Sequence, residues 1–334
     1  MPKIRKVIND PERVVVEVLE GICALAGGEL VLLPEARVLH RAQLREDKVA
    51  LVVGGGAGHE PMYGAFVGPG LADASVSGEI FAAPAPERIV AAARAVHRGR
   101  GVLFVYGNYA GDNLNFDMAA ELLAEEGIET RTVRVADDVA SADPAARRGI
   151  AGAVYQVKVA GYACEQLPTL EQAAALVERA KENIRSFGVA LAAGSLPHTG
   201  EPTFELGADE IEIGMGVHGE RGVERRPWMP ADELVDFMTA RLLADLPHRR
   251  GDRLAVLVNN LGSTTFGELM IAYRRLRHLL DQRGLVVARS DVGPYFTSQE
   301  MAGFSITLMR LDEELERALA FPARSPGFVE PPRS

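Results

Sequence analysis

The chain has 334 residues, of which 47% are hydrophobic, and a formal net charge of −10. This composition is typical of a globular protein of about two domains, and the acidic balance argues against nucleic-acid binding. Hydrophobic runs are shorter than a membrane helix requires, and the N-terminal segment lacks the apolar core of a secretory signal. We therefore expect a cytoplasmic protein with neither a nucleic-acid nor a membrane partner.

The chain has only two cysteines, Cys23 and Cys164. No CxxC spacing occurs that would bind a metal through thiolates or form a redox pair. Both cysteines stand in apolar segments of helical character, so we expect both side chains in the core.

The first half of the chain alternates between predicted helices and strands. Asn9-Asp10-Pro11-Glu12 has a capping side chain followed by proline, which is typical of a helix start, and Gly27-Gly28 indicates where that helix stops. Segment 48–53 is almost continuously apolar, as expected of a strand buried on both faces. Similar patterns predict strands over 101–107 and 129–137 and helices over 87–97 and 116–127.

The second half repeats the alternation after a predicted helix from Thr169, capped together with Gln172, to about Ser186. We expect one domain at 1–186 and another at 187–334, with an irregular Pro-rich tail. The predicted fold class is two α/β domains, each a mostly parallel or mixed sheet flanked by helices. The second domain's predicted strands are 188–193, 210–217, 253–260, 284–290 and 304–311, and its predicted helices are 231–244, 266–281 and 312–320.

A run of aliphatic residues ends in LVVGGGAGHEP, residues 51–61. A dinucleotide-binding GxGxxG motif fails because His59 stands in place of its last glycine, and a Walker loop fails because it needs Gly-Lys at His59-Glu60. Glycines at the carboxyl end of a strand can instead let a small ligand touch backbone N–H groups. The alternative is a tight turn beside a surface histidine. The glycines concerned are Gly54, Gly55, Gly56 and Gly58.

Two further glycine-rich segments carry candidate residues. In VYGNYAGDNLNFD, Asp112 either caps the following helix or lies beside His59 as a proton-transfer pair. In GMGVHG, His218 has little steric cover, so it either approaches a ligand closely or lies on an ordinary loop. The other histidines lack such a setting and are expected at the surface: His40, His97, His198, His248 and His278.

A metal site is a chemical alternative for the same residues. His59, His218 and Asp112 are a ligand set that can hold zinc or iron. No HxH or HExxH spacing supports this alternative, and we predict that the chain binds no metal.

Four motifs in order, GGGAGHEP, GNYAGDNLNFDMAAE, DEIEIGMGVHGERG and FTSQEMAGFSITLMRLDEEL, resemble the substrate-binding subunit of dihydroxyacetone kinase, called DhaK. The resemblance covers almost the whole chain. It implies two α/β domains, a homodimer, and a ketose in the first domain that is bonded covalently, as a hemiaminal, to a histidine of the second.

The resemblance also implies a role for each candidate residue. His218 matches the covalent histidine, His59 matches the histidine that contacts the substrate, and Asp112 matches the aspartate near the hydroxyl that is phosphorylated. Alanine stands at position 57 where the family often has serine. The residues that match the backbone around the substrate are Gly56, Ala57 and Gly58.

The implied chemistry selects for ketones. A neutral imidazole nitrogen of His218 adds to the carbonyl carbon and forms a reversible carbinolamine, which glycerol cannot do because it has no carbonyl. Asp112 is the expected base for the terminal hydroxyl and His59 its partner, although the chemistry allows the two roles to be exchanged.

The sequence contains no obvious machinery for holding a nucleotide. We find no Walker loop, no kinase glycine loop and no aspartate cluster of Mg²⁺ type. The chain is therefore expected to bind no cofactor itself. The resemblance implies that ATP or ADP with Mg²⁺ resides on a DhaL-type partner, or that a phosphotransferase-system donor supplies the phosphoryl group through that partner.

Gly107 departs from the family pattern, because many members have lysine five residues before the aspartate. Losing that cation leaves space, so the pocket is expected to accept a larger ketose such as the four-carbon erythrulose. Two alternatives stay open at this point: a non-catalytic ketose sensor and a metal-dependent lyase or isomerase. Asp112 favours the enzyme, because sensing needs no base.

Overall fold

The computed structural model describes residues 5–332, which form two compact units. The first unit comprises Val7–Val135, Ala153–Lys181 and the described residues from Leu315 onwards. The second comprises residues 5–6, Ala136–Gly152 and Glu182–Glu314. The units are thus interleaved along the chain rather than consecutive.

The predicted boundary at 186/187 lies inside strand β7 (Ile184–Ala192). The stretch 136–152 belongs with this strand because Ser186 donates to the carbonyl of Asp137 at 2.7 Å and accepts from the N–H of Val139 at 3.0 Å. An assignment of the ketose to one domain and the covalent histidine to the other stays a prediction.

The first unit contains a mixed sheet of six strands in the order β1-β2-β4-β3-β5-β6. The four strands β4, β3, β5 and β6 are parallel. β2 pairs with β4 in antiparallel fashion, and β1 pairs with β2 in the same way. Residues on both faces of β3 are buried, which accounts for its continuous apolar run. The strands are β1 (Leu30–Leu33), β2 (Val38–Arg41), β3 (Lys48–Ala57), β4 (Ala74–Ile80), β5 (Gly99–Gly107) and β6 (Thr130–Val135).

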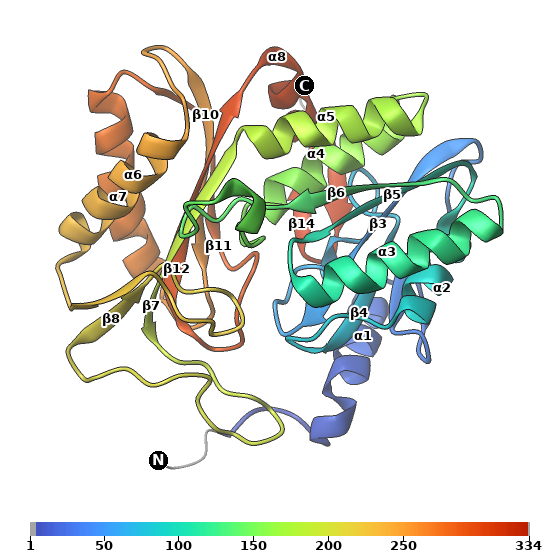
Figure 1. Cartoon of the computed structure of the whole chain (residues 1–334), viewed down its shortest axis with the longest axis horizontal. Helices are drawn as coiled ribbons and strands as arrows, with labels where there is room; N and C mark the ends of the chain where they lie inside the picture. The colour runs from blue at the N-terminus through green and yellow to red at the C-terminus, as the bar shows by residue number, and fades with distance from the viewer. Residues whose placement is uncertain (1–4, 333–334) are drawn as a thin grey trace. The chain divides into compact units, whose positions relative to one another are not determined.

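Helices cover this sheet (Figure 1). α2 (Pro86–Val96) and α3 (Ala110–Glu125) pack together, and Phe104 of β5 and Phe116 of α3 are fully buried between helices and sheet. α4 (Ala153–Gln166) packs against β3 and β5. Nearly every residue of α4 is buried, so it lacks the one-sided apolar pattern that would have predicted it.

Two helix predictions in this unit can be compared directly with the structure. α1 (Val14–Leu25) follows a short 3-10 turn and begins as predicted, because Asp10 accepts a hydrogen bond from the N–H of Glu12 at 3.0 Å. α5 (Leu170–Glu182) begins with Thr169 accepting from the N–H of Gln172. The prediction that this helix reaches Ser186 is wrong, since β7 starts at Ile184.

The prediction of an irregular tail is also wrong. β13 (Ala323–Ser325) and β14 (Phe328–Glu330) form an antiparallel hairpin that belongs to the first unit. The rings of Phe328 and Phe66 lie 5.5 Å apart, and the N–H of Arg324 donates to the carbonyl of Pro69 at 3.0 Å. Such short strands depend on tertiary contacts rather than on local propensity, so the Pro-rich composition was misleading.

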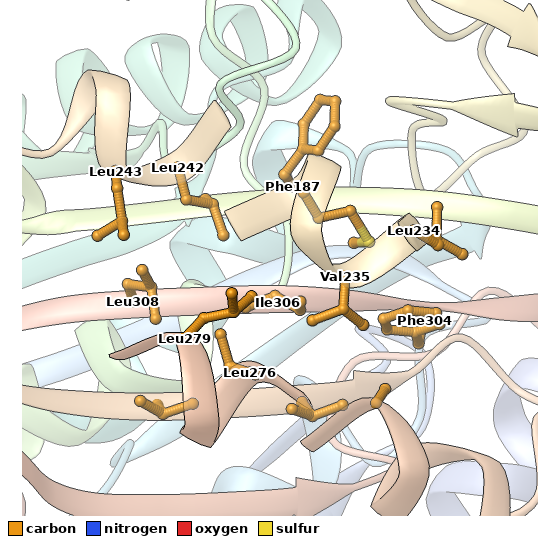
Figure 2. Packing of buried hydrophobic residues seen from close by; sticks show 14 of the residues in the cluster. Phe187, Leu234, Val235, Leu242, Leu243, Leu276, Leu279, Phe304, Ile306 and Leu308 are labelled. Carbon is orange, nitrogen blue, oxygen red and sulfur yellow. The ribbon is translucent and has the colours of Figure 1, made fainter. Parts of the chain in front are cut away.

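The second unit contains a mixed sheet in the order β11-β10-β12-β7-β8-β9, in which only β10 and β11 pair in parallel. Helices α6 (Ala231–Asp245) and α7 (Phe266–Gln282) pack together on one face. Figure 2 shows their leucines meeting side chains of the sheet such as Ile306 and Leu308. The remaining elements are β8 (Glu210–Ile213), β9 (Glu224–Pro227), β10 (Arg253–Asn260), β11 (Val286–Gly293), β12 (Ala302–Leu311) and α8 (Glu313–Ala320), which leads into the first unit.

Both units therefore have the predicted α/β class, with a mixed sheet flanked by helices. Glycines shift two strand boundaries. β8 ends at Ile213 because Gly214 turns with φ of +73°, so the strand predicted to reach residue 217 is four residues shorter. β3 runs on through the three glycines to Ala57, which places them inside the sheet rather than in a loop.

The cysteines and histidines only partly follow the predictions. Cys164 is buried as expected, whereas Cys23 is half-buried. His198 and His278 are exposed, but His40, His97 and His248 are half-buried rather than fully at the surface.

Among residues 5–332, no helix is both long and apolar enough to cross a membrane.

We expect Gly161→Ala to destabilise the first unit, because a Cβ there would lie 2.3 Å from the carbonyl oxygen of Gly70 and 2.7 Å from Cα of Leu71. The loop backbone cannot move aside cheaply, so the loss should be about 1–3 kcal/mol in the free energy of unfolding. Gly21→Ala in α1 is the matched control, since nothing lies within 4 Å of its Cβ position. It should stabilise by up to about 1 kcal/mol. Denaturant titration measures both, and equal effects of the two substitutions would contradict this packing.

Candidate functional site

The first candidate residues follow two neighbouring strands, β3 and β5, which pair in parallel. β3 connects to β4 on one side and β5 connects through α3 to β6 on the other, so the chain leaves these two strand ends in opposite directions. Ligands in α/β proteins bind at such a switch point, outside the carboxyl ends of the strands. The candidate residues that follow β3 and β5 thus lie at the topological switch point of the sheet.

Asp112 lies in the first turn of α3 and is buried, with 6% of its surface exposed. It does not cap the helix, because Tyr109 occupies the capping position and no side-chain cap is formed there. Its carboxylate instead faces β3. Atom Oδ1 lies 3.7 Å from where a Cβ would stand on Gly55. The structure thus brings Asp112 to the glycine segment, and a proton-transfer pair of Asp112 with His59 stays a prediction.

Tyr63 is a neighbour that the sequence did not reveal. A ring carbon of Tyr63 lies 3.2 Å from the same Cβ position on Gly55. Gly55 has φ of +154°. The ring of Tyr63 and the carboxylate of Asp112 both line the side of the Gly55 backbone on which a side chain would stand. No motif in the sequence indicated this tyrosine.

His59 is buried, with 1% of its surface exposed, rather than lying at the surface. Its ring packs against that of Phe81, with centroids 5.1 Å apart and an angle of 32° between the planes. Next to it, Glu60 accepts a hydrogen bond from the N–H of Gly58 at 3.0 Å, and burial raises the pKa of Glu60. The alternative of a surface histidine on a tight turn is therefore wrong.

Two of the glycines make room for the protein's own backbone. A Cβ on Gly54 would lie 2.5 Å from the carbonyl oxygen of Val76, and one on Gly56 would lie 2.8 Å from the N of Ala82 and 2.9 Å from Cα of Phe81. These positions require glycine whether or not a ligand is present. Contact of Gly56, Ala57 and Gly58 with a substrate stays a prediction.

His218 lies in the second unit, on the connection between β8 and β9. Met215 and Val217 are buried and anchor this loop, whereas 20% of the His218 side chain is exposed. Gly219 follows with φ of +80°, a conformation that favours glycine. The loop thus presents an imidazole on a fixed main chain.

Glu220 holds this imidazole, and the sequence reasoning missed it. Its Oε1 lies 2.9 Å from Nδ1 of His218, and its Oε2 accepts the backbone N–H of His218 at 2.9 Å. Burial acts to raise the carboxyl pKa, but hydrogen bonds and charge from His218 outweigh it and lower the pKa of Glu220 to about 2. The available signal was an acid two residues after the histidine in HGERG.

Further polar groups fix the loop from both sides. Arg148 donates to the carbonyl of Gly214 at 2.7 Å and to Asp138 at 2.8 Å. Burial raises the pKa of Asp138 to about 6 although Arg148 acts to lower it. On the other side, the hydroxyl of Ser298 donates to the carbonyl of Val217, directly before His218. Ser298 belongs to the FTSQEM motif, which thereby gains a structural role.

Neighbouring residues connect the same motif to the start of the chain. Glu300 accepts hydrogen bonds from the hydroxyl of Ser195 and from Lys6, which also donates to Gln299 at 3.2 Å.

In the part of the chain that the structure describes, no three His, Cys, Asp or Glu side chains group together as metal ligands would. His59 and Asp112 lie in the first unit and His218 in the second.

A family model described as "Dak1 domain" matches residues 20–327. The chain is 41% identical over 329 residues to a Listeria innocua protein described as the dihydroxyacetone-binding subunit DhaK of PTS-dependent dihydroxyacetone kinase 2, a match that covers 97% of this chain and 99% of that protein. It is 40% identical over 327 residues to the L-erythrulose kinase of Pectobacterium atrosepticum, which covers 96% of this chain but 55% of that kinase.

Solved structures agree with these matches. The native dihydroxyacetone kinase of C. freundii has a TM-score of 0.90 at 34% identity, covering 99% of this chain and 61% of that one. The dihydroxyacetone kinase operon co-activator DhaQ has a TM-score of 0.89 at 30% identity, covering 94% and 98% of the two chains.

The chain therefore belongs to the Dak1 family of dihydroxyacetone kinases. Within that family it matches the DhaK subunit over nearly the whole length of both chains, whereas it spans only about half of the erythrulose kinase. The resemblance stated from the four sequence motifs is confirmed.

The low pKa of Glu220 predicts a pH-dependent contribution to stability. The pKa falls from 4.5, its ordinary value, to about 2 in the folded protein. The bond to His218 therefore stabilises the fold above pH 4.5, and this contribution is lost as the pH falls through 2. We expect thermal unfolding temperatures of the protein and of Glu220→Gln to converge over this window. Glu205→Gln, at an exposed glutamate of the same unit, should follow the unmodified protein throughout. A constant gap between the protein and Glu220→Gln would contradict the expectation.

Proposed function

We propose that this chain is the substrate-binding subunit of a short-chain ketose kinase, and that it captures the ketone of its substrate as a hemiaminal on His218. The observation that carries the proposal is the presentation of His218. Its imidazole is partly exposed on a loop whose main chain is anchored by Met215, Val217 and Ser298. Membership of the Dak1 family supports the substrate class, because its relatives are named dihydroxyacetone and erythrulose kinases.

Covalent capture gives the protein its selectivity. A neutral imidazole nitrogen adds to the electrophilic carbonyl carbon, and the bond breaks again when the product leaves. Glycerol shares the carbon skeleton and the terminal hydroxyl groups of dihydroxyacetone but has a hydroxyl in place of the carbonyl, so it cannot form this bond. Discrimination thus rests on a bond that only one of the two molecules can make, which exceeds what small differences in pocket shape supply.

Asp112 and His59 have the remaining chemical roles in this proposal. Asp112 takes the proton of the terminal hydroxyl as its oxygen attacks phosphorus, and His59 orients the substrate. Both side chains are buried, and exclusion of water strengthens the electrostatic interactions of groups inside a site. The substrate would lie against the backbone at Gly56, Ala57 and Gly58.

The phosphoryl donor belongs to a partner in this proposal. ATP or ADP with Mg²⁺ would be held by a DhaL-type subunit, or a phosphotransferase-system donor would act through it, and the chain itself would form a homodimer. The name of the Listeria relative, a PTS-dependent kinase subunit, supports a separate donor protein. These assemblies would operate in the cytoplasm.

A ketose sensor is the second candidate function. It is supported by the structural likeness to the co-activator DhaQ at 30% identity. Asp112 favours the kinase, because a sensor needs the capturing histidine but no base at the hydroxyl. Asp112 lies beside Gly55, in the first turn of α3, near the strand ends at which α/β proteins bind ligands.

We expect His218→Asn to abolish capture. With dihydroxyacetone labelled with ¹³C at its carbonyl carbon, the unmodified protein should show a new tetrahedral-carbon NMR signal, which His218→Asn should lack. His198→Asn, at an exposed histidine of the same unit, should keep the signal. Asp112→Asn should also keep it, but should lower phosphorylation with the partner by about 100-fold or more. An undiminished signal in His218→Asn would refute the proposal.

A separate prediction concerns the preferred ketose. It rests on Gly107, the last residue of β5, which has no side chain. We expect kcat/KM, measured with the partner subunit, to favour erythrulose over dihydroxyacetone by roughly tenfold, as one extra carbon unit in a fitted pocket allows. Glycerol serves as the ketone-free control. A clear preference for dihydroxyacetone would count against the larger pocket and leave the capture chemistry intact.

A further inference from the structure

The first unit contains a cavity that is not part of the candidate site. Its volume is about 310 Å³, and neither the glycine segment nor His59 nor Asp112 lines it. We propose that this cavity binds a small, neutral polyhydroxy compound without forming a covalent bond. The lining comes from four segments of the first unit, within residues 26–30, 41–43, 67–69 and 324–326.

Arg41 provides the hydrogen-bond donors of this cavity. It is the last residue of β2 and lines the cavity with a side chain that is only 14% exposed. Within residues 5–332, every side-chain hydrogen bond of Arg41 uses Nη1, which donates to Asp73 at 2.9 Å and to Glu165 at 2.6 Å. The N–H groups at Nε and Nη2 form the other edge of the guanidinium. That edge offers a ligand two parallel donors.

The charges around the cavity cancel. Behind the guanidinium, buried Lys48 donates to both oxygens of Asp73 at 2.8 Å and to Glu165 at 3.3 Å, so two cations face two carboxylates. Arg324 and Glu29, which both line the cavity, form an ion pair of their own. A charged ligand would therefore bring in a charge that these groups do not balance, and removing such a charge from water is costly. A neutral ligand avoids this cost.

Hydroxyl groups suit the cavity because each of them both accepts and donates hydrogen bonds. Two neighbouring hydroxyl oxygens can accept from the free edge of Arg41. Glu29 bonds to Arg324 through Oε1, so its Oε2 can accept from a further hydroxyl. Val67 and Pro69 add apolar surface for the C–H groups of the ligand. A volume of about 310 Å³ is at the lower end of ligand pockets, so the ligand is small.

The lining of the cavity is held in place by contacts within the protein. The N–H of Arg324 donates to the carbonyl of Pro69 at 3.0 Å, and the N–H of Ala42 donates to the carbonyl of Glu29 at 2.9 Å. The hairpin also lies directly on Gly68, where a Cβ would stand 2.1 Å from the carbonyl oxygen of Arg324. Because the cavity is formed by these contacts, binding costs little ordering of the chain.

Ligand choice distinguishes this cavity from the proposed capture site. Among the described residues that line it, there is no histidine, lysine or cysteine, so no imidazole, amine or thiol is available to add to a carbonyl. The cavity should accept a polyol that lacks a carbonyl, whereas capture on His218 requires a ketone. The inference is therefore independent of the proposed function.

Erythritol, a polyol without a carbonyl, is the probe for this cavity. In NMR spectra of the full chain with ¹³C-labelled alanine methyl groups, we expect the signals of Ala26 and Ala42, which line the cavity, to shift saturably. The dissociation constant should be on the order of 1 mM, as befits a small ligand with few contacts. The methyl signal of Ala57, in the glycine segment, should not shift. Absence of a saturable shift at Ala26 and Ala42 would overturn the proposal.

Arg41→Lys keeps the positive charge beside the two carboxylates but removes the free donor edge, so it should weaken erythritol binding by about tenfold or more. Arg45→Lys is the matched control, because Arg45 donates to the backbone carbonyl of Glu165 at 3.0 Å without lining the cavity. Ala42→Leu is a second variant that leaves every charged group in place and should block binding by filling the cavity, with Ala26 as the reporter. Unchanged affinity in both Arg41→Lys and Ala42→Leu would contradict the assignment.

Sodium acetate tests the charge argument. We expect acetate to shift the signals of Ala26 and Ala42 less than erythritol does at equal concentration. Tighter binding of acetate than of erythritol would overturn the choice of a neutral ligand. The ¹³C signal of the ketone adduct can be recorded on the same protein, so failure of the cavity proposal and failure of capture on His218 are observed separately.

Discussion

Close approach of other protein atoms to glycine backbone is the constraint on which both candidate sites depend. At Gly54 the carbonyl of Val76 occupies the space that a side chain would need, and at Gly216 the carboxylate of Glu220 does so. A glycine-rich segment is often interpreted as a flexible chain or as space for a ligand. Here the empty positions are filled by other parts of the protein, so the glycines fix the main chain rather than loosen it. The main chain next to His59 and His218 is fixed by these contacts.

A fixed main chain matters for the capture that we propose, which is covalent but reversible. Aligning an imidazole with a carbonyl before the bond forms removes much of the entropic cost of the encounter. The loop around His218 would provide this alignment through ordinary interactions. Met215 and Val217 are buried, the hydroxyl of Ser298 bonds to the carbonyl that precedes His218, and the carboxylate of Glu220 contacts the ring. None of these groups needs to touch the substrate. The chemistry proposed for one nitrogen thus depends on packing within the histidine loop and on its bond to the segment around Ser298.

The sequence predicted the alternation of strands and helices well where each element has a one-sided or fully apolar pattern, as in β10 and α7. It failed for α4, which is buried on all sides, and for the C-terminal hairpin, whose pairing depends on distant residues such as Phe66. The placement of Asp112 beside the glycine segment followed from parallel strand ends. Tyr63 and Glu220 were missed because their roles depend on side-chain directions, which a one-dimensional pattern does not contain.

The interleaving of the two units has a consequence during protein synthesis. The sheet of the first unit begins at Leu30, yet Phe328 and Arg324, which pack on Phe66 and Pro69, are made almost three hundred residues later. A nascent chain that still lacks this hairpin leaves the surface around Phe66 uncovered while the whole second unit emerges from the ribosome. The first unit therefore reaches its complete set of native contacts only after the second unit has been synthesised, unlike a domain that can fold as soon as its own segment has been made. The hairpin, made near the end of synthesis, completes the unit whose sheet is made first.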